Sequence, residues 1–223
     1  QGDEGLANEF VGYCTQGVQG GAFLYTNSES LSVGVIVQAK SLIEHRIRAV
    51  DLLHDLKEHP VIAPMVRGGT LREFSAHLIP ERGLQMSPRL YTDGMLVVGD
   101  AAALVLATGL ILEGNNFAIA SGMAAAETVM RAKQVGDFSS GSLAHYERLL
   151  KESFVLKDLR TFQRVPNFLE NPRMYSSYPD LVCGIMEQML GANGGPRKPL
   201  WRTARDATKG KVSLWQLLQD SVR

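Results

Sequence analysis

The sequence predicts an α/β protein in which an α+β layer precedes a strand, a turn of small residues and a long helix. Two β-rich runs, 21–26 and 31–37, are followed by a helical pattern over 46–59. Further along the chain, the apolar run Met95–Val98 leads into the small-residue turn at 99–102, with the sequence GDAA. Sheets of α/β proteins present ligand-binding groups in this way, at the carboxyl ends of their strands.

The first part of the chain is predicted to form a sheet layer with one helix. The two β-rich runs flank Asn27–Ser30, which is typical of a hairpin with a four-residue loop. Between Arg46 and His59 apolar residues recur at helical spacing, and Pro60 then ends the pattern. Thr70–Pro80 alternates as a returning strand would, so we expect an α+β layer over residues 1–90.

Helices are predicted to dominate the rest of the chain. The long helix begins near Gly114 and ends at Gly136, and Ser139 is a suitable N-cap for a helix through Leu150. Helical patterns continue over 153–164 and 179–190. Residues 191–211 carry six Lys or Arg and one Asp, a net of 6 − 1 = +5, which predicts a basic loop or tail before a short helix over 212–222.

Composition limits the partners and the compartment. Lys plus Arg and Asp plus Glu number 23 each, so no overall charge attracts nucleic acid and we predict no such partner. The two cysteines, Cys14 and Cys183, lie far apart, and the histidines show no ligand spacing. We therefore predict no metal site and a reducing, cytoplasmic compartment. The sequence has no run of about 18 apolar residues that would predict a membrane span.

The residues with the clearest chemistry stand at the predicted strand end. Glycine at position 99 lets another molecule approach the backbone closely, and the carboxylate of Asp100 can accept hydrogen bonds from sugar hydroxyls. Small Ala101 and Ala102 then let the chain turn tightly. The alternative is an ordinary turn between a strand and a helix, in which Asp100 is a helix N-cap.

The start of the long helix is the second candidate element. Gly109 and Gly114 flank the loop that precedes it. The free N–H groups at a helix start form a partially positive end, which can stabilise a phosphate or the negative charge on a reduced flavin ring. The alternative, that small residues allow close packing here, is compatible with this role. We predict cofactor binding by Gly99, Asp100, Ala101, Gly109, Glu113, Gly114, Asn115 and Asn116.

Several separated motifs carry a family resemblance. Residues 94–122 read GMLVVGDAAALVLATGLILEGNNFAIASG; the hairpin GGAFLYTNSESLSVGVIV precedes them, and SFVLKDLRTF and ENPRMYSSYPDL follow. In this order the motifs resemble the C-terminal half of FixC-type flavoproteins, relatives of electron transfer flavoprotein-quinone oxidoreductase and of geranylgeranyl reductases. The resemblance runs through most of residues 15–190.

The resemblance implies an arrangement of parts. Residues 1–90 would form a substrate or quinone domain, 91–136 the C-terminal half of a glutathione-reductase-like FAD domain, 137–190 a helical cap, and 191–223 a basic tail with a short helix. Asp100 would contact the ribityl and pyrophosphate region of FAD. The helix that starts near Gly114 would point at the pyrimidine end of the flavin.

The resemblance also implies a function. The complete protein would transfer electrons through FAD from an electron transfer flavoprotein-type partner to a quinone-like acceptor, with a ferredoxin-like protein as a further partner. Alternatives on the same fold are an isoprenoid reductase of the geranylgeranyl type and a flavin monooxygenase. A further alternative is a non-catalytic piece that acts only in interactions.

Three departures from the family's pattern qualify this function. No GxGxxG follows a strand, so we expect the C-terminal part of a longer oxidoreductase or a truncated fragment, which alone is inactive and binds FAD weakly or not at all. Glu113 stands where FixC-type members carry arginine, as in the geranylgeranyl reductase form of the loop, and its charge disfavours an anionic reduced ring. Ala103 stands where glycine is usual.

Three other features have two interpretations each. His77 is either a proton donor to quinone or substrate, or a structural hydrogen-bonding residue. Aromatic and basic side chains mix over 154–178, which is typical of helices packed on the FAD domain or of peripheral contact with the inner face of a membrane. The basic tail around Trp201 is either solvated or docked on an acidic partner.

Overall fold

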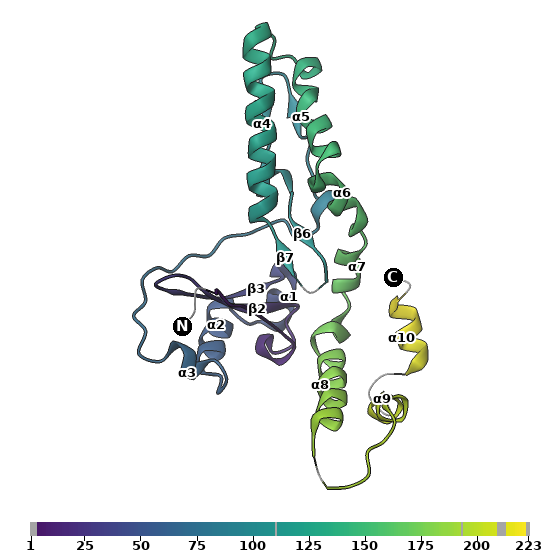
Figure 1. The fold of residues 1–223 in the computed structure, drawn as a ribbon. Coiled ribbons are helices and arrows are strands. Elements are labelled where there is room, and N and C mark those ends of the chain that lie inside the picture. The colour runs from purple at the N-terminus through teal and green to yellow at the C-terminus, as the bar shows by residue number, and fades with distance from the viewer. Residues whose placement is uncertain (1–3, 110, 193, 209–212, 222–223) are drawn as a thin grey trace. The chain divides into compact units, whose positions relative to one another are not determined.

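The computed structural model describes residues 4–109, 111–192, 194–208 and 213–221. The fold consists of helices and small antiparallel sheets (Figure 1), which confirms the predicted α/β class. The chain divides into two compact units: unit 1 is residues 1–73 with 169–223, and unit 2 is residues 74–168. This division reflects packing between residues. It does not test the four functional parts predicted from the sequence, which stay predictions: residues 1–90, 91–136, 137–190 and 191–223.

Unit 1 begins with a three-stranded sheet in the order β1-β2-β3, formed by β1 (Ala7–Val11), β2 (Gly20–Thr26) and β3 (Leu31–Val37). Both pairings are antiparallel. The register sets Thr26 opposite Leu31, and the Asn27 amide donates to the Ser30 carbonyl at 2.8 Å. The predicted hairpin with its four-residue loop is therefore confirmed.

Three helices follow the sheet: α1 (Ala39–His45), α2 (Ala49–Glu58) and α3 (Ala63–Val66). The predicted helix over 46–59 corresponds to α2, whose Leu56 is buried with Ala22 and Leu24 of β2. Helix α1 was not predicted. It is separated from α2 by Arg46, which closes α1 in the left-handed conformation with φ 55°.

The strand predicted over Thr70–Pro80 is wrong. This stretch forms no strand or helix, and the side chains of Leu71, Phe74 and Leu78 are exposed. An alternating pattern produces a strand only where a neighbouring strand takes up its backbone hydrogen bonds and a core buries one of its faces. Neither condition is met here.

Unit 2 contains short strands and a long helix. The pairs are β4 (Tyr91–Thr92) with β5 (Met95–Leu96), and β6 (Leu106–Ala107) with β7 (Leu112–Glu113); 3₁₀ turns lie at η2 (Gly83–Gln85) and η3 (Gly99–Ala102). The buried strand predicted over Met95–Val98 is correct only in part. Its paired segment ends at Leu96, and Met95 is 53% exposed, because two residues of β4 are all that pair with it.

The helices of unit 2 are α4 (Asn115–Val135), α5 (Ser140–Glu152) and α6 (Phe154–Thr161), followed by α7 (Val165–Leu169) at the boundary of the units. Helix α4 ends at Gly136 in the left-handed conformation, and the Ser139 hydroxyl accepts a hydrogen bond from the Ser142 amide, as predicted. Helices α4 and α5 pack side by side in Figure 1. Their shared core contains Phe117, Tyr146 and Leu150, which are fully buried.

The C-terminal part of unit 1 comprises η4 (Pro172–Tyr175), α8 (Ser177–Leu190), α9 (Leu200–Thr208) and α10 (Leu214–Ser221). The prediction of a loop or tail over 191–211 is wrong for the residues of α9. The high count of Lys and Arg masked an amphipathic pattern, in which Thr203 is buried and the guanidinium groups of Arg202 and Arg205 lie over the exposed ring of Trp201 at 5.2 and 5.3 Å. The short predicted helix at the end corresponds to α10.

An ion pair with a buried carboxylate joins α10 to η4. The Arg173 guanidinium donates to the Asp220 carboxylate through Nε at 2.9 Å and Nη2 at 2.8 Å, and the Tyr178 hydroxyl donates to the same carboxylate. Asp220 is 3% exposed. Hydrogen bonds from Arg173 and Tyr178 hold the pKa of Asp220 well below its usual range.

Candidate functional site

The Gly99–Asp100 turn is built by two left-handed residues. Gly99 has φ 56°, and Ala103 ends η3 with φ 55°. The Asp100 carbonyl accepts from the Ala103 amide at 2.9 Å, and the Gly99 carbonyl accepts from the Leu104 amide at 3.1 Å. The chain therefore reverses within four residues, and the Asp100 side chain is left exposed.

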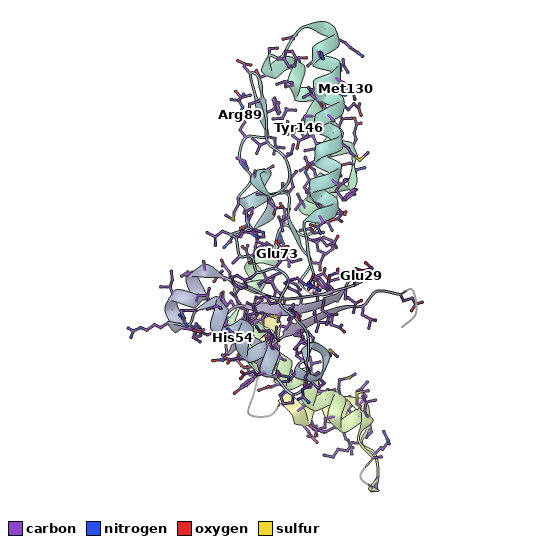
Figure 2. The ribbon with its side chains drawn as sticks, turned by 90° about the vertical axis from the view of Figure 1, so that its left-hand side faces the viewer. Glu29, His54, Glu73, Arg89, Met130 and Tyr146 are labelled. Atoms are coloured by element: carbon purple, nitrogen blue, oxygen red, sulfur yellow. The ribbon has the colours of Figure 1, made fainter. Side chains whose placement is uncertain are left out.

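Two buried side chains, Ser121 and Tyr146, form hydrogen bonds through their hydroxyl groups to the backbone of this turn and of the segment before it. The Ser121 hydroxyl of α4 accepts from the Gly99 amide at 3.0 Å and donates to the Ala118 carbonyl at 3.0 Å. The Tyr146 hydroxyl of α5 donates to the Val97 carbonyl at 3.0 Å, and Figure 2 shows Tyr146 beside α4. Burial raises the pKa of Tyr146 to about 12, which the nearby Ser121 hydroxyl opposes. The phenol is therefore a neutral donor at physiological pH.

These two residues were missed by sequence reasoning. Ser121 lies 22 residues from its partner Gly99, and Tyr146 lies 49 residues from Val97, so no local pattern links them. One signal was present: Ser121 is four residues after the buried Phe117, which places a polar side chain on the apolar face of a helix. A buried hydroxyl there needs a partner.

The β6–β7 hairpin brings the helix start back to the turn. Its register sets Leu106 opposite Glu113, and Gly109 adopts φ 100° in the connecting loop. Gly114 is then the N-cap of α4, and a Cβ added to it would lie 3.6 Å from Asp100 Oδ1. The two elements predicted to bind a cofactor are therefore neighbours in space.

Side chains at the start of α4 accept hydrogen bonds from only some of its backbone N–H groups. The Asn116 amide group donates to Glu113 Oε2 at 2.7 Å, and Asn116 Oδ1 accepts from the Phe117 amide at 3.1 Å. The Gly114 carbonyl accepts from the Ala118 amide at 2.8 Å. Within the described part of the chain, the backbone N–H groups of Asn115 and Asn116 have no acceptor. They remain free to donate to a ligand.

These residues fit one side of a flavin nucleotide. Asp100 offers an exposed carboxylate to hydroxyl groups, Gly99 and Gly114 keep the approach free of side chains, and α4 offers N–H donors to an electron-rich ring or a phosphate. Ala101 lies in the same turn and is exposed. Gly109 lies apart, in the hairpin loop. The assignment of these residues to a cofactor stays a prediction.

Other candidates lie away from this cluster. His77 is exposed in the segment without regular structure, and no hydrogen bond or ion pair in the described residues joins it to the turn. A cavity of about 360 Å³ in unit 2 is lined by Leu90, Leu156, Arg89 and Arg160 among others, and none of the predicted cofactor residues borders it. Among the described residues, no group of three His, Cys, Asp or Glu side chains could hold a metal ion.

The aromatic and basic stretch 154–178 shows mixed exposure. Phe154 packs edge-on against Phe117 with 5.2 Å between ring centroids, and Tyr175 is buried, whereas Arg160 and Arg164 are exposed. The aromatic groups named here therefore contribute to packing. Across the described ranges, we find no helix with the length and apolar character needed to cross a membrane.

Comparison with known proteins identifies relatives of the whole chain. Residues 165–223 match the family model of the ETF-QO/FixC family C-terminal domain. The chain is 41% identical over 222 residues to the "Probable electron transfer flavoprotein-quinone oxidoreductase YdiS" of Escherichia coli K12 and 40% identical over 227 residues to "Protein FixC" of the same organism. "Protein FixC" of Azotobacter vinelandii is 35% identical over 224 residues. The predicted resemblance to the C-terminal portion of FixC-type flavoproteins is confirmed.

The matches cover all of this chain but only part of the relatives. The alignments take in 100% of the 223 residues and 52% of each relative, so the chain spans about half the length of the curated relatives it matches. A solved structure, the geranylgeranyl bacteriochlorophyll reductase-like protein of Thermoplasma acidophilum, matches with a TM-score of 0.60 at 21% identity, over 96% of this chain and 49% of that one. This likeness concerns the fold.

Proposed function

Because the chain is related along its whole length to FixC-type flavoproteins, we propose that it forms the C-terminal part of an FAD-dependent oxidoreductase. In this proposal the complete protein passes electrons from an electron transfer flavoprotein-type partner to a quinone-like acceptor. The observation that carries it is the position of Asp100 beside Gly114 at the start of α4. The names of the relatives with about 40% identity support the same function.

In this proposal the residues of the chain bind and orient the cofactor. The Asp100 carboxylate accepts hydrogen bonds from hydroxyl groups, and the first N–H groups of α4 donate to the electron-rich end of the ring. Ser121 and Tyr146 fix the backbone on which Asp100 stands. A bound flavin supplies the redox chemistry itself.

An FAD-retention experiment tests this function. The 223-residue chain is joined to the part of E. coli Protein FixC that lies outside the matched region, and the flavin absorption of the fusion is measured after gel filtration. We expect the fusion to retain FAD and the chain alone to lose it. Asp100→Ala should weaken FAD binding by about tenfold or more, because it removes a hydrogen-bonding charge. Asp158→Ala on α6 is the control and should leave binding unchanged.

The outcomes separate the functional classes. Loss of FAD from the wild-type fusion would contradict the oxidoreductase proposal and favour a non-catalytic interaction piece. If the Asp100→Ala fusion bound FAD as tightly as wild type, Asp100 would be excluded as a cofactor-binding residue.

Glu113 favours a second candidate, an isoprenoid reductase of the geranylgeranyl type. Its carboxylate, held by Asn116 at 2.7 Å, places negative charge at the helix start that faces the proposed ring. This charge disfavours an anionic reduced ring. Turnover of the FAD-loaded fusion with a quinone and with a prenyl lipid distinguishes the two, and reduction of the prenyl lipid alone would reject the quinone acceptor.

The remaining roles belong to the same proposal. They are an electron transfer flavoprotein and a ferredoxin-like protein as partners, a cytoplasmic location, and peripheral contact with the inner face of the membrane. Arg160 and Arg164 are the exposed basic residues for that contact. An Arg160→Glu, Arg164→Glu variant should bind anionic liposomes less than wild type in a flotation assay, and unchanged binding would rule this contact out.

His77 is the proposed proton donor to the quinone or substrate. If it has this role, His77→Ala should lower the turnover of the FAD-loaded fusion. Unaltered turnover would show that His77 is a surface residue without a role in the reaction.

A further inference from the structure

The cavity of unit 2 lies apart from the predicted cofactor residues. Its volume is about 360 Å³, at the lower end of the range of about 300–1,000 Å³ that is typical of small-molecule sites. Residues between 84 and 91 line it together with α5 and α6, and Figure 2 shows Arg89 on the side of unit 2 away from Met130 of α4. None of the predicted cofactor residues borders the cavity, so it is a second candidate for ligand binding.

One wall of the cavity is apolar. Leu156 is 4% exposed and belongs to the buried core of unit 2, and Leu84 and Leu90 pack against the same core. Packing holds these side chains in place, so the wall is formed before a ligand arrives. An alkyl group that covers this wall leaves water, and each buried methylene should strengthen binding by about fourfold.

Two guanidinium groups border the same cavity. The side chains of Arg89 and Arg160 are exposed, and within the described residues neither guanidinium forms a hydrogen bond or an ion pair. Arg89 interacts with the exposed carboxylate of Asp93 through its charge alone. A guanidinium presents a planar fork of N–H donors that matches the two oxygens of a carboxylate. Both groups are therefore available to an anionic ligand.

The third charged residue of the cavity is Glu147. Its carboxylate forms an ion pair with Lys151 at 2.9 Å, and both belong to α5. Among the lining residues, two positive charges and one negative charge leave a single net positive charge. This balance matches a ligand with one negative charge.

We propose that this cavity binds a free monocarboxylate with a short alkyl chain. The carboxylate accepts hydrogen bonds from Arg89 and Arg160, and the chain covers Leu84, Leu90 and Leu156. The small volume limits the ligand to a short chain. The site is separate from the proposed flavin site, and its ligand binds without a flavin.

Calorimetric titration of the 223-residue chain with sodium octanoate tests the site. We expect saturable binding to one site. Hexanoate should bind about tenfold more weakly, because it buries two fewer methylenes. Octanol should bind at least about tenfold more weakly, because a neutral hydroxyl group forms weaker hydrogen bonds with a guanidinium than a carboxylate does. Absence of saturable octanoate binding, or equal affinity for octanol, would overturn the proposal.

Two variants locate the binding. Arg89→Gln removes a charge and should weaken octanoate binding by at least about tenfold. Ser87→Phe fills the cavity but keeps its charges, and should have the same effect. Arg148→Gln is the control, because Arg148 is exposed on α5 and does not line the cavity. The melting temperature of each variant shows that it is folded, and wild-type affinity in folded Arg89→Gln would contradict the proposed site.

A flotation assay distinguishes a free carboxylate from a phospholipid head group. Arg89 has no part in the membrane contact proposed for Arg160 and Arg164, so Arg89→Gln should bind phosphatidylglycerol vesicles as wild type does. Weaker vesicle binding by Arg89→Gln, without octanoate binding by wild type, would assign Arg89 to a membrane surface and reject the free ligand. FAD retention by the fusion is measured separately, so failure of the flavin proposal leaves this result unaffected.

Discussion

The Gly99–Asp100 turn of unit 2 and the η4–α10 contact of unit 1 are held in place by opposite chemistry. The turn rests on neutral buried hydroxyl groups, with Ser121 bonded to the Gly99 amide and Tyr146 to the Val97 carbonyl. The C-terminal contact rests on a charged pair, Arg173 with the buried Asp220. A neutral anchor and an ionic anchor respond to pH in opposite directions, so the two regions should fail at opposite ends of the pH scale.

The largest effect is expected from Asp220→Ala. This change removes the common partner of the Arg173 guanidinium and the Tyr178 hydroxyl, and leaves both without their acceptor. Helix α10 should detach, and chymotrypsin should cleave after Trp215 faster than in any variant below. Asp158→Ala is the matched control. Unchanged protection of α10 would show that apolar packing alone holds it.

The same contact should be sensitive to acid. The pKa of Asp220 is lower in the folded protein than the value of about 3.9 for an unfolded aspartate, so its contribution to stability is complete above about pH 4. It is lost as the pH falls through the folded pKa. Asp220→Asn should abolish this dependence on pH, as measured by the rate at which pepsin, which is active in acid, cleaves within α10.

The second largest effect is expected at Gly99. Gly99→Ala should lower the free energy of unfolding by about 2 kcal/mol, because a left-handed alanine costs about 1–2 kcal/mol and its Cβ would also press on Ala118. The distance between that added Cβ and Ala118 Cβ would be 3.3 Å. Gly94→Ala is the control, since Gly94 has φ 72° but no atom near its added Cβ. Equal losses in urea unfolding would contradict the close contact.

Tyr146→Phe should have an intermediate effect. It leaves the Val97 carbonyl without its donor, which costs about 1–2 kcal/mol. The pKa of Tyr146 is raised from the ordinary 10.0 to about 12, so burial favours the neutral phenol. Stability from this group is complete below about pH 10 and is lost as the pH rises through 12. Urea unfolding at alkaline pH should show this loss in wild type and not in the variant.

The smallest effect is expected from Ala103→Gly. Ala103 is left-handed, with φ 55°, but its methyl group is buried. Relief of about 1–2 kcal/mol of strain is offset by the lost burial and by the added chain freedom of glycine, which leaves a net change below about 0.5 kcal/mol. This balance explains how alanine is accommodated at this left-handed position. A gain well above this value in urea unfolding would contradict it.

Local features of this fold were readable from the sequence, and distant contacts were not. The hairpin at Asn27–Ser30 and helix α4 up to Gly136 have turn and cap residues that act within a few positions. The strand expected over Thr70–Pro80 failed because alternation says nothing about a pairing partner. Helix α9 was hidden by its charges, which lie on its exposed side around Trp201.

The candidate site divides in the same way. The GDAA turn and the helix start at Gly114 were identified from residue types, and the fold brings them together through the β6–β7 hairpin. The supporting hydroxyl groups of Ser121 and Tyr146 could not be identified, because only the packing of α4 and α5 brings them to the turn. Whether these residues bind FAD stays a prediction.

The placement of tryptophan gives the C-terminal helices an optical signal of their own. The chain has two tryptophans, Trp201 in α9 and Trp215 in α10, and both belong to unit 1. Tryptophan fluorescence therefore reports on the C-terminal helices alone, and the cationic groups over Trp201 should shift its emission when α9 unfolds. Ionisation of Tyr146 should appear instead as the part of the phenolate absorbance that Tyr146→Phe lacks, because all six tyrosines of the chain contribute to that absorbance. Titrations of wild type and Tyr146→Phe, read at both signals, can thus follow the two regions without an added label.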